Sequence, residues 1–113
     1  MKSASLLAGA ISLALVSALA SSQQSTETER GEVVFDQWCA PCHAPGPGHP
    51  GTQALDALYQ GSKPGALEAR TDLIPALTRT FVRNGAAVMA PFRKTEISDA
   101  ELEALAAYLA PRD

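Results

Sequence analysis

The sequence predicts a small all-α domain. Apolar residues recur with helical spacing in segments that begin near Glu29, Pro75 and Ser98, and no segment alternates polar and apolar residues as a half-buried strand would. The chain has 113 residues, which is enough for one domain. We therefore expect three to five helices around a single centre, without internal repeats or a second domain.

The N-terminal segment 1–20 has the pattern of a secretory signal peptide. Lys2 precedes an apolar run over 6–19, and Ala18-Leu19-Ala20 forms a small-x-small cleavage site. A membrane anchor is the alternative, but the run is short and rich in Ser and Ala. No cysteine follows the run, which excludes a lipoprotein anchor. We expect export and cleavage near Ala20.

The segment 21–28 is polar and lacks large apolar residues, so it predicts a flexible leader. The first helix is expected from about Glu29. Gly31 lies within it, and a glycine inside a helix usually has a packing reason. We expect a close helix crossing there, with Phe35 and Tyr108 meeting where the first and last helices cross.

Three further helices have terminal signals. The segment 53–60 predicts a short helix that stops at Gly61. Pro75 suits a first helical position, and Asn84-Gly85 ends the helix that it opens. The last helix starts with a capping box of Ser98 and Glu101, followed by an apolar stripe of Leu102, Leu105, Ala106 and Leu109.

Cys39-Ala40-Pro41-Cys42-His43 is a C-x-x-C-H motif, the attachment site of a c-type haem. Residues three apart share one face of a helical turn, so the thiols of Cys39 and Cys42 can form thioethers with two vinyl groups of one porphyrin. His43 then offers a ring nitrogen to the iron. A thioredoxin-like dithiol would need a βαβ setting, and a zinc site would need four ligands. One covalent haem c, and hence single-electron transfer, is the favoured interpretation.

The second axial ligand is expected to be Met89. Met1 leaves with the signal peptide, so Met89 is the remaining methionine, in a loop 46 positions after His43. His49 is a rival but follows His43 too closely to reach the opposite face of a haem. A vacant position is the third possibility, and it would favour gas binding or peroxide chemistry. Thioether ligation favours Fe(II) and raises the potential.

Other side chains have weaker claims. Core packing and contact with the porphyrin are both open for Trp38, Tyr59, Phe81 and Phe92. Solvent exposure and pairing with haem propionates are both open for Lys63, Arg79 and Arg83.

The net charge and the export signal restrict the kinds of partner and the compartment that we expect. Without Lys2, eight basic and twelve acidic side chains remain, a net charge of −4. Such a chain is a poor nucleic-acid ligand and favours a partner with a basic docking face. Covalent haem attachment in bacteria occurs outside the inner membrane, so the motif and the signal peptide together predict a periplasmic protein.

The pattern Gly31-x-x-x-Phe35-x-x-x-Cys39-x-x-Cys42-His43, followed by a methionine loop and a helix carrying Tyr108, resembles class I cytochrome c over residues 29–110. The resemblance implies a single-haem cytochrome c domain at 29–113. It implies an electron carrier whose catalytic chemistry, if any, lies in a partner. It also places Pro47 where small c-type cytochromes supply a carbonyl to the second ring nitrogen of the haem histidine.

A narrower resemblance covers three segments, 81–85, 91–92 and 96–102. They are similar to the cytochrome subunit of 4-cresol methylhydroxylase and of eugenol or 4-alkylphenol dehydrogenases. This implies a FAD-containing partner of the vanillyl-alcohol-oxidase type, which oxidises the phenol and passes electrons singly to the haem. Ala90 separates Met89 from Pro91, where that group commonly has Met-Pro. The alternative is a free-standing cytochrome c between dehydrogenases and a terminal oxidase.

Overall fold

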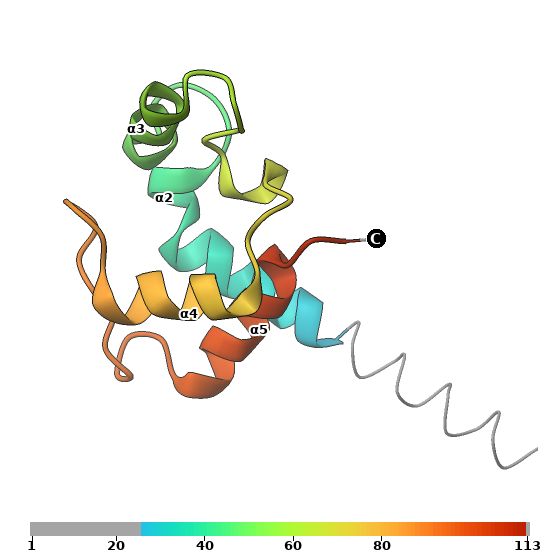
Figure 1. The fold of residues 1–113 in the computed structure, drawn as a ribbon. Helices are drawn as coiled ribbons and strands as arrows, with labels where there is room; N and C mark the ends of the chain where they lie inside the picture. The colour runs from blue at the N-terminus through green and yellow to red at the C-terminus, as the bar shows by residue number, and fades with distance from the viewer. Residues whose placement is uncertain (1–25, 113) are drawn as a thin grey trace, which may run out of the picture.

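The computed structural model describes residues 26–112, and these form an all-α domain (Figure 1). A first helix occupies residues 26–38. The elements that follow are α2 (Ala40–His43), α3 (Pro50–Tyr59), the 3-10 helix η1 (Leu67–Ala69), α4 (Pro75–Asn84) and α5 (Asp99–Leu109). The described part contains no strand beyond an isolated bridge between Ala86 and Met89. The predicted all-α class, with up to five α-helices, is confirmed.

The start of the first helix differs from the prediction. Residues 26–28, expected within the flexible leader 21–28, are helical. Polar composition alone does not prevent a helix that is continuous with a buried stripe, because tertiary packing of its later turns supports the earlier ones. The signal peptide expected at 1–20 and the remainder of the leader lie outside the described residues. None of the helices in residues 26–112 is long and apolar enough to span a bilayer.

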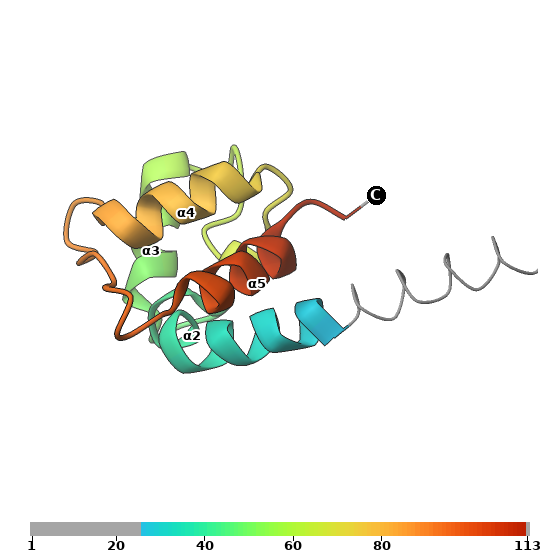
Figure 2. The same ribbon diagram turned by 90° about the horizontal axis from the view of Figure 1, so that it is seen from below.

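The core lies where the first helix, α4 and α5 pack together. Phe35, Ile97 and Leu105 are its largest fully buried side chains. Figures 1 and 2 show α5 lying against both the first helix and α4. A Cβ atom on Gly31 would lie 2.6 Å from Tyr108 Cβ and closer still to the Ala104 carbonyl oxygen. The expected close crossing at Gly31 is confirmed.

After the first helix, the predicted helix ends agree with the structure except for the start of α3. Pro75 occupies the first turn of α4, and Gly85 follows its last residue with φ of 72°. The capping box of α5 is formed, with Ser98 N–H donating to Glu101 Oε2 at 2.8 Å. The α3 helix begins at Pro50 rather than residue 53, because proline suits the first turn and the Gln53 N–H already bonds back to residue 49.

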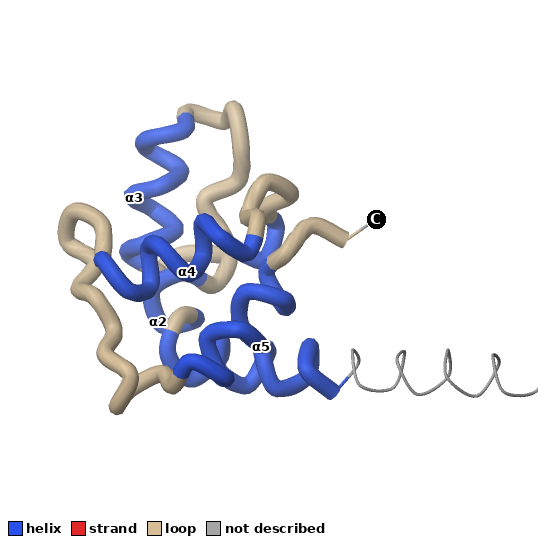
Figure 3. Tube along the Cα trace, turned by 60° about the horizontal axis from the view of Figure 1, so that its bottom comes forward, coloured by secondary structure: helices blue, strands red, loops and turns tan. Residues whose placement is uncertain are grey.

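Two long connections surround these helices (Figure 3). One joins α3 to α4 and contains η1. The other, residues 85–98, joins α4 to α5 and carries Met89. We call residues 85–92 the methionine loop. In Figures 1 and 2 this loop lies at the same end of the molecule as α2, so the fold brings the two predicted ligand segments to one end.

Candidate haem site

The C-x-x-C-H motif extends the first helix by one tight turn. The Cys39 N–H donates to the Phe35 carbonyl at 2.8 Å, and the His43 N–H donates to the Cys39 carbonyl at 2.8 Å. The Cys42 N–H also donates to the Cys39 carbonyl at 3.1 Å. The helix that packs into the core through Phe35 therefore fixes the orientation of the motif. Both thiols lie on a single turn, with Cys39 buried and Cys42 exposed.

The environment of Cys39 disfavours its thiolate form. Burial, and secondarily the nearby Cys42, raises the pKa of Cys39 to about 12. The thiolate is the reactive form in exchange chemistry, so Cys39 would be largely inert at neutral pH. Residues 26–112 also contain no cluster of three or more His, Cys, Asp or Glu side chains able to hold a metal ion. The zinc interpretation therefore has no support among the described residues, and Cys39 itself would be a poor nucleophile.

The imidazole of His43 packs directly against the backbone at Gly51. A Cβ atom there would lie 2.6 Å from His43 Cε1, 2.8 Å from Nδ1 and 2.7 Å from the Cys42 carbonyl oxygen. Only glycine fits this position without displacing the ring or the backbone. Burial lowers the pKa of His43, which favours the neutral imidazole that binds metals.

The His43 Nδ1 atom is buried and has no hydrogen-bond partner. The expectation that the Pro47 carbonyl accepts from it is therefore wrong for this structure. Gly46 and Gly48, on either side of Pro47, have φ values of 97° and 89°, a backbone conformation that favours glycine. Two thiols on one turn and an adjacent imidazole are nevertheless the donor set of a haem c site.

The loop after His43 is attached at both ends. Thr52 Oγ1 donates to the Ala44 carbonyl at 2.9 Å, and His49 Nδ1 lies 3.2 Å from the Pro41 carbonyl oxygen. His49, the predicted rival ligand, thus bonds to Pro41 within the motif itself. This contact leaves Met89 as the better candidate for the opposite face.

Met89 lies at the end of a tight turn. Its N–H donates to the Ala86 carbonyl at 2.8 Å, and the Ala86 N–H donates back at 3.0 Å. A Cβ atom on Gly85 would collide with the Met89 carbonyl oxygen, so glycine is required at the base of this turn. Val88 at the tip is fully exposed, whereas Met89 is partly buried.

Aromatic contact links the two predicted ligand segments. The rings of Trp38 and Phe92 meet edge to face with centroids 5.9 Å apart. Trp38 directly precedes Cys39, and Phe92 follows Met89 by three residues. The sequence alone does not specify the partner of either aromatic residue. Tyr59 instead lies beside the Arg70 guanidinium, 4.9 Å from its ring centroid, and Phe81 is 43% exposed on α4.

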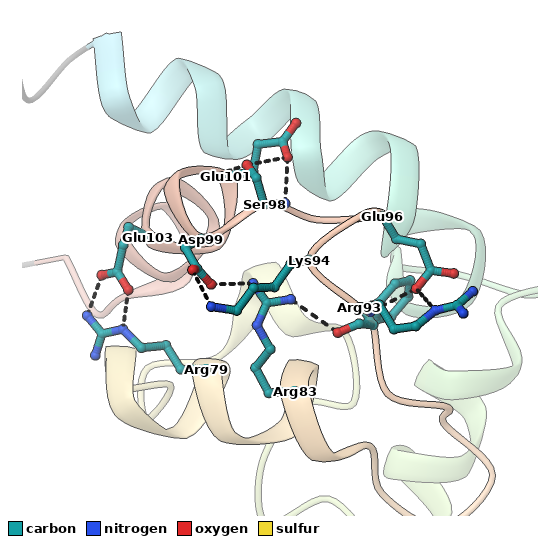
Figure 4. Close-up of polar contacts among 10 residues, drawn as sticks. Arg79, Arg83, Arg93, Lys94, Glu96, Ser98, Asp99, Glu101 and Glu103 are labelled. Atoms are coloured by element: carbon teal, nitrogen blue, oxygen red, sulfur yellow. Dashed lines mark hydrogen bonds and ion pairs between the residues drawn. The ribbon is translucent and has the colours of Figure 1, made fainter.

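The three candidate propionate partners each bind a carboxylate of the chain. Lys63 pairs with Asp72, Arg79 with Glu103 and Arg83 with Asp99, at 2.9, 2.6 and 3.0 Å. Figure 4 shows the two arginines side by side on α4, directed toward α5. A surface cleft of about 280 Å³ beside Glu68, Arg70 and Tyr108 contains none of the predicted haem residues.

The family model described as cytochrome c oxidase, cbb3-type, subunit III matches residues 26–109. The chain belongs to this family. It is a class I c-type cytochrome, and its all-helical structure has the cytochrome c fold. Membership implies haem c as the cofactor and electron transfer, rather than catalysis, as the role. Comparisons with curated proteins and with solved structures gave no match.

Proposed function

We propose that this cytochrome holds one covalent haem c through thioethers of Cys39 and Cys42, with His43 and Met89 as axial ligands. The observation that carries the proposal is the arrangement of α2. Two thiols lie on one helical turn, and the adjacent imidazole packs against Gly51 through Cε1 and Nδ1, which leaves Nε2 as the ring nitrogen for the iron. The two thiols and the imidazole match the group in number and in chemistry.

Bound haem c would supply a one-electron Fe(III)/Fe(II) couple. The chain sets its properties through ligation and burial. His43 offers a neutral nitrogen and Met89 a soft thioether, a pair that favours Fe(II) and raises the potential. The segments on either side of the site are fixed by the Gly85 turn and by the Trp38–Phe92 contact, which limits reorganisation when the charge changes.

The electron donor in this proposal is a flavoprotein dehydrogenase of the 4-alkylphenol or eugenol type. Support comes from the resemblance of segments 81–85, 91–92 and 96–102 to the cytochrome subunits of such enzymes. Two of these segments, 81–85 and 91–92, include the ends of the methionine loop, whose exposed Val88 offers apolar surface to a protein partner. The phenol chemistry would belong to the flavoprotein, and both proteins would act in the periplasm after cleavage near Ala20.

A second candidate is an oxidase-linked carrier. The matching family is described as a subunit of a cbb3-type cytochrome oxidase, so a role in delivering electrons to a terminal oxidase has support of its own. In this case the cytochrome would accept electrons from several dehydrogenases rather than from one bound flavoprotein.

Copurification and reduction assays separate the two candidates. The native cytochrome is isolated under mild conditions, and its haem spectrum is recorded after adding a 4-alkylphenol. The first proposal predicts a copurified flavoprotein and rapid haem reduction by the phenol. A cytochrome isolated alone, inert to the phenol but oxidised by membranes that contain the oxidase, would support the second and contradict the first.

A further inference from the structure

Phe92, at the end of the methionine loop, has both of its backbone polar groups bound to α4. Its N–H donates to the Val82 carbonyl at 2.8 Å, and its carbonyl accepts from Arg83 Nη1 at 3.1 Å. The other arm of the same guanidinium, Nη2, donates to Asp99 Oδ1 at 3.0 Å. Arg83 therefore joins the end of the loop to α5, whose first residue is Asp99 (Figure 4).

We propose that Arg83 is a positioning residue for the Met89 ligand. The inference rests on the proposed ligation by Met89 and goes beyond it. Only two residues, Ala90 and Pro91, separate Met89 from Phe92, and Pro91 has a fixed φ. A shift of Phe92 would therefore move Met89 as well.

Through Phe92, Arg83 also fixes the end of the methionine loop relative to the haem-binding turn. The Phe92 ring contacts Trp38, and Trp38 adjoins Cys39. Direct contacts therefore run from α5 to the Arg83 guanidinium, from there to Phe92, and from Phe92 to Trp38 beside the C-x-x-C-H motif. At the other end of the loop, the Ala86–Met89 pairing fixes the turn. With both ends held, the thioether of Met89 is confined to one region.

Arginine suits this role better than lysine. Its planar guanidinium donates in two directions at once, to a carbonyl and to a carboxylate on different elements. The Arg83 side chain is only 23% exposed, so its hydrogen bonds are partly shielded from water. Lys94 also binds Asp99, at 2.6 Å through Oδ2, which leaves Oδ1 to Arg83. A lysine at position 83 could satisfy one acceptor at a time.

Arg79 is a matched control on the same helix. It lies one turn before Arg83 and makes a two-armed ion pair with Glu103, at 2.7 and 2.6 Å. Both of these side-chain hydrogen bonds go to α5, and neither reaches the methionine loop. Loss of Arg79 tests the effect of removing an α4–α5 ion pair alone.

The experiment uses ferric holoprotein titrated with imidazole, which competes with methionine for the iron. The charge-transfer band of methionine-ligated haem reports displacement, and urea unfolding reports global stability. The variants are Arg83→Met, Arg83→Lys, Arg79→Met and Arg79→Lys. Loss of the hydrogen bonds that the guanidinium donates should tighten apparent imidazole binding about tenfold in Arg83→Met, and by a smaller factor in Arg83→Lys, which can still satisfy one acceptor. Both Arg79 variants should titrate like the parent protein.

Three results would overturn the inference. Arg83 variants could bind imidazole like the parent, or Arg79 variants could shift as far as Arg83 variants, which would indicate a general stability effect. A parent protein without the methionine band would remove the proposed ligand and the positioning role together. If Arg83→Met yields no holoprotein, Arg83→Lys and Arg83→Gln carry the same comparison.

Discussion

The rings of Phe35 and Tyr108 contact each other with centroids 5.8 Å apart and planes inclined by 48°. This contact lies where the first helix crosses α5, beside Gly31. Tyr108 also donates its hydroxyl proton to Glu68, which ties η1 to the same crossing. The Phe35 carbonyl accepts a hydrogen bond from the Cys39 N–H. The helix crossing therefore supports the haem-binding turn directly.

Gly31→Ala should destabilise this crossing. The added Cβ would lie 2.6 Å from Tyr108 Cβ and closer to the Ala104 carbonyl oxygen, so one helix must move. Overpacking of this kind costs about 1–3 kcal/mol, measured by urea unfolding of the holoprotein. Gln37→Ala, at an exposed position of the same helix, is the control. Equal stability of the two variants would show that the helices do not approach as closely as described.

Gly51→Ala should disturb the His43 ligand without touching its side chain. A methyl group 2.6 Å from His43 Cε1 requires the imidazole or α3 to shift. We expect a lower yield of holoprotein and a changed potential, read from haem absorbance and spectroelectrochemistry. Gly46→Ala is the comparison, because it has open space and carries only the strain of its φ of 97°, about 1 kcal/mol. Indistinguishable behaviour of these variants would argue against the Gly51 contact.

Met89→Ala should keep the haem attached, because the thioethers are intact, but should lower the reduction potential. The loss of a thioether ligand removes a preference for Fe(II). The change should be on the order of 0.1 V, a fraction of the roughly 0.8 V range that axial ligands govern. Val88→Ala, at the neighbouring exposed position, should leave the potential unchanged. An unaltered potential in Met89→Ala would exclude Met89 as a ligand.

Asp72→Asn should reduce stability at neutral pH, and by progressively less as the pH falls below about 4. The Asp72 carboxylate accepts from Arg70 at 2.5 and 2.8 Å and from Lys63 at 2.9 Å. Arg70, followed by Lys63, holds the pKa of Asp72 well below its usual range. A lowered folded-state pKa adds stability that is present above the unfolded-state pKa and is lost as the pH falls.

The measurement is urea unfolding at pH 7 and at pH 3 or below. The parent should exceed Asp72→Asn by about 1 kcal/mol at pH 7, since the carboxylate is partly exposed. The difference should shrink below about pH 4, where the unfolded Asp is protonated. Asp36→Asn, on the exposed side of the first helix, serves as the control. A difference that grows on acidification would reverse the assigned sign.

Local signals predicted much of this fold. The Ser98–Glu101 capping box, Pro75 at the start of α4 and Gly85 after its end each satisfy a backbone requirement within a few residues. Such requirements can be recognised without knowledge of distant contacts. The geometry of the C-x-x-C-H motif can likewise be predicted locally, because its three functional residues share one helical turn.

Long-range contacts could not be predicted in the same way. Arg83 was recognised as a cation that could pair with a propionate, but its contacts are the carbonyl of Phe92 and the carboxylate of Asp99. Nothing within a few residues of Arg83 specifies these partners. The place of Gly51 against His43 depends on how the intervening loop folds back. Its signal was a glycine inside the first turn of a helix, where glycine has no local advantage.

Mass spectrometry of the mature protein, after denaturation and acid extraction, tests the central claim most directly. A covalent haem c on Cys39 and Cys42 predicts a mass equal to the processed chain plus one haem, with neither thiol open to alkylation. A chain of unmodified mass with two alkylatable thiols would contradict the account.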